Sequence, residues 1–465
     1  MKKFYSKVAG AAVVGVALLG FAGMASALDI NIYGASAQYL FWNDAADNFL
    51  TDTVANGGAG CSAATQNEPD SKHGVTQGTN CPTHGTINIR YTAKASYDGL
   101  LACQDKNYPG ATAQCPNNDR QRLFADVGTT TLTCRDVTVA ASDVAAKSFD
   151  QRTSLRNFKT QKPIDLDANG DPHDVLLPAN QPLVVPFAFV VTNDVTVKQC
   201  MGPDLLEPTP SAHKAFSPFG NVCYENADCV GYYKCTDETC DGGVNIGGTC
   251  TTYAQCPDVE EAAAECLEAP LNNMTRLMAT NIFSGKATNW KDFGDYFPNA
   301  PIYKCFRHAG SGTHATLDFA VMRGNGWGWD LQFWMPNATW SDGTGDLMSC
   351  MDTHDYAVGY ADADRLYGKN KEAMHVVQYE GVSPTRDRIR NGLYNFWSAQ
   401  WMYTCDDTTG DQQTMAQTLA DYASDPDNIP VTKELFWAAK KEMRFMKSSD
   451  QAWSQKVIPA LPQTP

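Results

Sequence analysis

The sequence predicts an α/β protein whose sheets are mostly parallel. Two observations predict it. Short apolar runs with strand character alternate with segments of helical periodicity, and this alternation returns from residue 271 onward after a Cys-rich interruption. Strands that alternate with helices form layers in which helices cover parallel sheets. The 465 residues suffice for two domains of ordinary size.

The expected elements follow in order along the chain. Apolar or alternating runs predict strands at 28–33, 87–91, 136–141, 183–191 (which contains Pro186), 301–306 and 356–360. Helical spacing predicts helices at 38–50, 272–283, 312–322 and 431–446, the last with Leu435, Phe436, Ala439 and Met443 on one face. Polar, irregular composition predicts loops at 51–86 and 145–180.

The first 27 residues have the features of a secretory signal peptide. A basic start is followed by an apolar run at 8–24 and by Ala25-Ser26-Ala27, which is typical of a cleavage site. A membrane anchor is the alternative, and the small residues in the run together with the cleavage site disfavour it. We therefore expect a mature protein from about Leu28, in the periplasm or at the cell surface.

The composition is strongly acidic. The formal net charge is −16, and removal of Lys2, Lys3 and Lys7 with the signal takes it to −19. Such a charge argues against nucleic acid and anionic membranes as partners. An anionic ligand would have to be held by local geometry against the field of the whole molecule.

Sixteen cysteines follow the signal, and eight of them lie between 200 and 266. An even number in an exported chain predicts disulfides, and the absence of any C-x-x-C gives no support to zinc ribbons or thioredoxin-like motifs. We interpret 200–266 as a small disulfide-stapled insert, because such a piece has too little apolar area to fold without staples. A metal cluster is the alternative, disfavoured by loose spacings and by the lack of histidine among these cysteines.

A second candidate metal site is the stretch 165–171. Asp165, Asp167, Asn169 and Gly170 have the spacing of the first half of a calcium loop, but the twelfth position is Leu176 instead of Glu. An Asx-turn loop is the favoured interpretation. The sequence therefore assigns no metal or other cofactor to the chain.

The stretch RHAGSGTH (307–314) lies between a predicted strand and a predicted helix. A hydrolase elbow needs Gly two residues before the serine, and position 309 is Ala, so nucleophilic catalysis is disfavoured. Backbone N–H groups at a helix start, the hydroxyls of Ser311 and Thr313 and the fork of Arg307 instead suit an oxyanion. A capped helix without a ligand is the alternative.

Several stretches resemble the periplasmic phosphate-binding proteins of bacterial ABC importers. NIFSGKATNWKDFG (281–294), R-x-x-GSGT (307–313), YAVGYAD (356–362) and GVSPTRDRIRNGLY (381–394) resemble that family in order and approximate spacing. INIYGASAQY (30–39), KASYDGL (94–100) and VAASDVA (139–145) resemble its three ligand turns less closely. Segments 51–86, 145–180 and 200–266 have no counterpart.

The resemblance implies a two-lobe periplasmic binding protein fold, in which each lobe is a mostly parallel sheet flanked by helices. Residues 28–186 and 377–465 would form lobe I, and 187–376 would form lobe II. The chain would cross between the lobes near Pro186 and near Val376. The Cys-rich insert at 200–266 would belong to lobe II.

The resemblance also implies an oxyanion held between the lobes. Asp143 would accept a hydrogen bond from a protonated anion, and the donors would be Ala37, Gln38, Tyr39, Ser96, Arg307, Ser311, Gly312 and Thr313. Ser36 is the nearest substitute for a hydroxyl that the first turn lacks, and Ala309 stands where many members have a carboxylate. Helix capping is the alternative role of Ser96 and Asp143.

The function that the resemblance implies is that of a non-enzymatic solute-binding protein, which captures phosphate outside the cytoplasm for an ABC permease in the inner membrane. Two alternatives remain. The unmatched segments favour a surface or interaction protein that reuses the scaffold. The altered turns at Gln38 and Ala309 favour a binder of another tetrahedral oxyanion.

Overall fold

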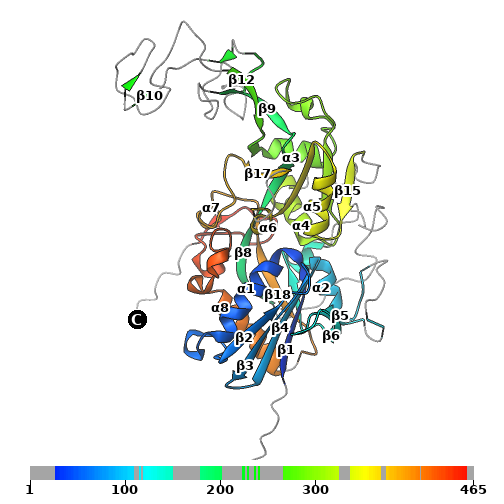
Figure 1. The fold of residues 1–465 in the computed structure, drawn as a ribbon, viewed down its shortest axis with the longest axis vertical. Coiled ribbons are helices and arrows are strands. Elements are labelled where there is room, and N and C mark those ends of the chain that lie inside the picture. The colour runs from blue at the N-terminus through cyan, green and yellow to red at the C-terminus, as the bar shows by residue number, and fades with distance from the viewer. Residues whose placement is uncertain are drawn as a thin grey trace, which may run out of the picture.

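In the computed structural model of the protein, the described residues are 27–108, 115–116, 119–149, 179–201, 222–225, 228–229, 235–236, 239–240, 265–323, 336–367, 373–408 and 410–457. The predicted signal peptide, apart from Ala27, and the stretch 165–171 lie outside them. Two lobes follow one another along the long axis of the molecule, and strands β9 and β12 project from one end (Figure 1).

A single 13-stranded sheet extends through both lobes. In lobe I it has the order β18-β7-β1-β4-β3-β2, from Trp397–Thr404, Val139–Ser142, Leu28–Ala35, Gly85–Lys94, His73–Cys81 and Ala63–Asn67. In lobe II it has the order β15-β14-β16, from Ala338–Ser341, Tyr303–Arg307 and Ala357–Asp362, with β17 (Met374–Tyr379) and β13 (Asn273–Met274) beside them. Strand β8 (Ala179–Thr192) lies between the two sets.

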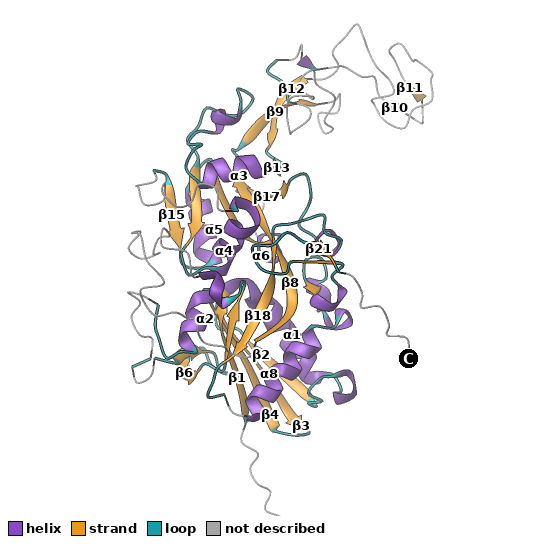
Figure 2. Ribbon diagram, turned by 180° about the vertical axis from the view of Figure 1, so that it is seen from behind, coloured by secondary structure: helices purple, strands orange, loops and turns teal. Residues whose placement is uncertain are grey.

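Strand β8 belongs to both lobes, as Figure 2 shows from behind. Its first half pairs with β18 as far as Pro186, and its second half pairs with β16 from Phe187 onward and with β17. The change of partner therefore falls between Pro186 and Phe187. Val376, where the second crossing was expected, lies inside β17 opposite Val190, and the chain enters β18 only at Trp397.

The predicted α/β, two-lobe fold is confirmed. Strand β1 is parallel to β4 and β7, and β14 is parallel to β15 and β16, whereas β8 and β18 run antiparallel to their neighbours. The parallel strands thus form the centre of each lobe. The antiparallel strands β8 and β18 lie between the two sets of parallel strands, while the antiparallel hairpin of β2 and β3 forms the outer edge of the sheet in lobe I.

Helices cover these strands. Three of the predicted helices are present as α1 (Tyr39–Thr51), α3 (Arg276–Phe283) and α4 (Gly312–Leu317), which a π-helical turn at Asp318–Met322 continues. The sequence did not identify α2 (Ser96–Ala102), α5 (Thr344–Thr353), α6 (Ala363–Tyr367), α7 (Arg386–Arg390) and α8 (Gly410–Ala423). Within the described residues, every helix is too short or too polar to cross a bilayer.

Two predictions about elements were wrong. The helix expected at 431–446 is instead two 3₁₀ turns, Val431–Lys433 and Lys440–Glu442, around the short strand β19 (Ala438–Ala439), which pairs with β8. The loop expected at 51–86 contains the hairpin of β2 and β3, and the Cys61–Cys81 disulfide closes it. In both segments, pairing with an existing strand outweighs local propensity.

Disulfides join twelve of the sixteen cysteines in the described part of the chain: 61–81, 103–405, 115–134, 200–229, 223–266 and 305–350. The insert begins and ends in the antiparallel ladder of β9 (Thr196–Met201) and β12 (Glu265–Pro270). The sulfurs of Cys200, Cys223 and Cys229 lie within 4.8 Å of one another. They belong to two disulfides and so are not thiolate ligands.

Candidate functional site

Five parallel strands end at the interface between the lobes. In lobe I, Ser36 and Asp143 directly follow β1 and β7, and Ser96 stands two residues after the end of β4. In lobe II, β14 ends at Arg307, and β15 is followed by the stretch from Asp342 to Thr344. The carboxyl ends of parallel strands are where α/β proteins bind ligands. The interface is therefore the candidate site.

Arg307 carries a buried positive charge in this interface. It is only 1% exposed. Its Nη1 donates to Thr344 Oγ1 (3.1 Å) and to Ser36 Oγ (3.4 Å), and Nη2 donates to the carbonyl of Asp342 (3.0 Å). Its Nε has no partner and no carboxylate pairs with it among the described residues. Within the described part of the chain, its hydrogen bonds all go to neutral oxygens, and the charges of Asp143, Asp342 and Asp362 act on it without a direct ion pair.

A hydrogen bond to Tyr360 fixes the backbone of Arg307. Its N–H donates to the hydroxyl of Tyr360 (3.1 Å), which also forms a short contact with Nδ1 of His314. All three residues are buried. A guanidinium whose backbone is anchored in this way keeps its fork in one place, which lowers the entropy cost of binding a ligand.

Asp143 is the acidic residue of the interface. Its backbone N–H donates to Ser96 Oγ (3.0 Å), and its Oδ2 accepts a hydrogen bond from Thr313 Oγ1 of the other lobe (3.2 Å). Its second oxygen, Oδ1, is buried and has no partner among the described residues. Because Ser96 accepts from a backbone amide, its own O–H remains a donor.

Burial raises the pKa of the Asp143 carboxyl to about 7. The nearby charge of Asp362 raises this pKa further, while Arg307 and the hydrogen bonds from Thr313 oppose the shift. Burial also raises the pKa of Asp362 to about 6. The interface therefore contains two carboxyl groups, Asp143 and Asp362, whose pKa values lie close to neutral pH.

Gly312 allows the two lobes to approach. A Cβ at this position would lie 2.3 Å from Ser96 Oγ and 2.7 Å from Asp143 Cβ, so any side chain would force the lobes apart. Beside it, Ser311 caps α4, because its hydroxyl accepts from the N–H of His314 (3.3 Å). The turn Ser311–Gly312–Thr313 thus combines a capping hydroxyl, a close backbone approach and a hydroxyl that faces Asp143.

The first turn of lobe I differs from expectation at one residue. Ser36–Gln38 form a 3₁₀ turn in which the N–H of Tyr39 donates to the carbonyl of Ser36. The Tyr39 amide is therefore already occupied, whereas the first N–H groups of such a turn, including that of Ala37, have no partner within it. The Gln38 side chain donates to the carbonyl of Ser142 (3.0 Å) and accepts from Trp42 Nε1 (2.9 Å).

Two ion pairs bridge the lobes beside the site. Lys94, two residues before Ser96, pairs with Asp342, two residues before Thr344, and both side chains are mostly buried. Lys72 and Asp346 form a second, exposed pair at 3.7 Å. The buried pair can form only when the lobes are together, so it stabilises the closed arrangement.

The structure brings the predicted residues together at the interface. The amide of Tyr39 is not available to a ligand, because it already donates to the carbonyl of Ser36. Sequence reasoning missed Thr344, Asp342, Lys94 and Asp362. A signal existed for Thr344, since Ser-Asp-Gly-Thr (341–344) resembles the Gly-Ser-Gly-Thr of 310–313, and both stretches lead into a helix. Lys94 and Asp342 are 248 residues apart, and no local pattern reveals such a pair.

The comparisons with known proteins agree with the two-lobe α/β fold. Residues 260–426, which contain Arg307 and the Ser311–Thr313 turn, match the model of the family described as PBP superfamily domain. This part of the chain is therefore similar to that superfamily, in agreement with the resemblance found in the sequence.

Solved structures with a similar chain include three phosphate-transport proteins. A putative phosphate ABC transporter substrate-binding protein from Clostridium perfringens is 14% identical, with 88% of this chain and 98% of that chain covered and a TM-score of 0.43. An ABC-type phosphate transport receptor from Vibrio cholerae is 12% identical (84% and 93%, TM-score 0.37), and PstS from Borrelia burgdorferi is 11% identical (88% and 98%, TM-score 0.34). Similarity of this degree does not define a ligand.

The raised pKa of Asp143 gives a testable dependence of stability on pH. An exposed Asp titrates near pH 4, whereas the pKa of folded Asp143 is about 7. Between these values the folded state holds a proton that the unfolded state has lost, so the free energy of unfolding falls as pH rises through this window. Asp143→Asn should reduce the drop in Tm of the ligand-free protein between pH 5 and pH 8.

The matched control is Asp126→Asn. Burial works against ionisation of Asp126, but hydrogen bonds from Arg135 and Thr133 hold the pKa of this carboxyl below its usual value. This variant should lose stability equally at pH 5 and pH 8. If the Asp143→Asn protein kept the full pH dependence of the wild type, Asp143 would be ionised in the fold.

Proposed function

We propose that the protein captures phosphate between its two lobes outside the cytoplasm and releases it to an ABC permease, without catalysing a reaction. The observation that carries the proposal is the buried guanidinium of Arg307, which has no carboxylate partner among the described residues. A buried charge is costly unless an opposite charge compensates it. An oxyanion in the cleft would supply that charge.

The balance of donors and acceptors supports phosphate in particular. The donors are the fork of Arg307, the hydroxyl of Ser96, at least one of the mutually hydrogen-bonded hydroxyls of Ser36 and Thr344, and the open amides at the starts of the 3₁₀ turn and α4. The hydroxyl of Thr313 already donates to Asp143. Asp143 supplies an acceptor. Phosphate near neutral pH carries a proton for such an acceptor, and sulfate does not.

Ala309 is the observation that favours the second candidate, another tetrahedral oxyanion. The resemblance would place a carboxylate there, and the buried Ala309 supplies none. Asp362, at the end of β16 in lobe II, is a second buried acid, and its charge raises the pKa of Asp143. We therefore retain phosphate as the proposal and treat the choice of anion as its most informative test.

Arg307→Ala should abolish tight phosphate binding. Loss of a buried charged contact costs about 2–5 kcal/mol, so the Kd should rise by a factor of roughly 30 or more. Isothermal titration of purified, phosphate-free protein measures it directly. Arg390→Ala, which removes an arginine far from the cleft that pairs with Glu442, is the control and should bind as the wild type does. Unchanged affinity in Arg307→Ala would remove the cleft from the proposal.

The wild type should bind phosphate and arsenate well and sulfate poorly. Sulfate would leave an ionised Asp143 facing a second negative charge, which costs several kcal/mol in a dry site. Asp143→Asn should weaken phosphate and strengthen sulfate, because an amide can turn its NH₂ toward the fully ionised anion. Competition titrations on both proteins test this. Equal affinities of the wild type for phosphate and sulfate would favour the second candidate.

Lys94→Met should weaken phosphate binding about 30-fold. The substitution removes the mostly buried ion pair between the lobes, and its loss should cost about 2 kcal/mol of binding free energy. Lys72→Met, which breaks the exposed pair across the same interface, should change the affinity less than twofold. The exchange Lys94→Asp with Asp342→Lys keeps the net charge. Phosphate affinity should partly recover in the exchanged protein if the ion pair holds the lobes together. Equal losses in the Lys94 and Lys72 variants would contradict this.

A further inference from the structure

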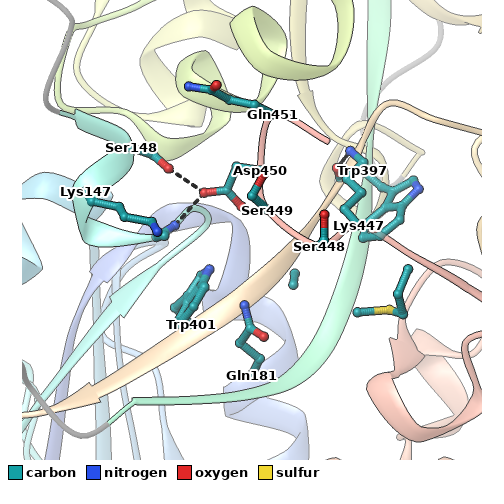
Figure 3. Close-up of a pocket in the computed structure, with 13 residues that line it drawn as sticks. Lys147, Ser148, Gln181, Trp397, Trp401, Lys447, Ser448, Ser449, Asp450 and Gln451 are labelled. Carbon is teal, nitrogen blue, oxygen red and sulfur yellow. Dashed lines mark hydrogen bonds between the residues drawn. The ribbon is translucent and has the colours of Figure 1, made fainter. Parts of the chain in front are cut away.

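A second cavity lies on the connection between the lobes, apart from the phosphate cleft. Its volume is about 360 Å³, within the range of small-molecule sites. Its floor comes from β8 and β18, its sides from the stretch 145–148, and its cover from the C-terminal segment 446–451. Figure 3 shows Trp401 and Gln181 on the side of the two strands, with Lys447 to Gln451 across from them.

The cavity has a flat apolar wall. Trp397, Ala399 and Trp401 line it from alternate positions of β18, and Met446 contributes from the cover. The ring of Trp401 is only partly buried and stacks on Tyr403 with an interplanar angle of 7°, so its orientation is fixed. A rigid indole face of this kind suits a planar ring.

The cavity is also basic. Lys147 and Lys447 line it, and Lys440 reaches its rim by donating to Gln181 Oε1 (2.6 Å). Two donors of the Lys447 ammonium go to the carbonyls of Asn395 (3.2 Å) and Trp397 (2.5 Å), which leaves a third. On a chain of net charge −16, such a cluster of lysines attracts anions locally.

Asp450 is the one carboxylate among the described residues of the lining, and one of its two oxygens is engaged. Asp450 Oδ2 accepts hydrogen bonds from the N–H of Ala145 (2.8 Å) and from Ser148 Oγ (2.5 Å), which attach the cover to lobe I (Figure 3). The exposed hydroxyls of Ser448 and Ser449 add donors at the rim. The free polar groups of the cavity are therefore chiefly donors.

We propose that this cavity is a second binding site, which takes a small aromatic carboxylate. The ring would lie on the face of Trp401, and the carboxylate would face Lys447 and the serines of the cover. Burial lowers the pKa of the Lys447 ammonium to about 7. A bound carboxylate would counteract that effect by favouring the charged form.

Benzoate is the probe, titrated by calorimetry into the full mature protein. We expect saturable 1:1 binding in addition to any phosphate binding. Acetate, which lacks the ring, and benzyl alcohol, which lacks the charge, should bind at least tenfold more weakly. Trp401→Ala and Lys447→Met should each weaken benzoate at least tenfold, and Ser449→Trp, a change at an exposed position, should block the cavity.

Two controls separate this site from other effects. Trp453→Ala removes a half-exposed tryptophan of the same C-terminal segment that does not line the cavity, and benzoate affinity should not change. Arg307→Ala should also keep benzoate affinity, so that failure of the phosphate site and of this site can be told apart. The proposal is overturned if the Kd for benzoate is above about 10 mM, that is, if the binding free energy is smaller than about 3 kcal/mol. Retained benzoate binding in the Ser449→Trp protein would also overturn it.

Discussion

The pairing of β8 with strands of both lobes is the constraint on which the remaining structure depends. A strand of 14 residues spans about 45 Å, and its two halves form ladders with different partners. Pro186 stands at the change of partner and cannot donate to a ladder. The lobes can therefore rotate about this point with little loss of hydrogen bonds, but they cannot separate. Any ligand site between them opens and closes as a hinge.

The same constraint explains why charged residues are buried where the lobes meet. The strand ends of both lobes face each other beside β8, so Arg307 and Asp143 leave water when the lobes close. A buried guanidinium without a carboxylate partner and a carboxyl with a raised pKa both lower the stability of the closed, empty protein. Under the proposed function, a protonated oxyanion would remove both penalties at once. The relief of this destabilisation would then contribute to the affinity for the anion and to the preference for a protonated one.

The sequence predicted those parts of the structure that depend on local chemistry. The turn from Arg307 to Thr313 was found because glycines, hydroxyls and a helix start occur within seven residues. The pairing of Lys94 with Asp342 and the disulfide connectivity join residues far apart in the chain, which local patterns do not encode. The predicted helix at 431–446 failed because four consecutive residues from Phe436 to Ala439 are buried, a pattern that suits an added strand on β8 and not one face of a helix.

The proposed phosphate site and the cavity beside Trp401 are connected through β18. Trp401, which lines the second cavity, lies opposite Ser142 in the sheet, and Ser142 directly precedes Asp143. The carbonyl of Trp401 also accepts from Gln38 (3.5 Å), which lies in the first ligand turn. A molecule that binds the second cavity more tightly in one lobe arrangement must shift the affinity of the cleft by the same factor, because linkage between two sites is reciprocal. The cover also contacts lobe II, because Arg323 Nη1 donates to the carbonyl of Gln451 (3.3 Å). A rotation of the lobes that moved Arg323 would therefore act on the cover of the second cavity.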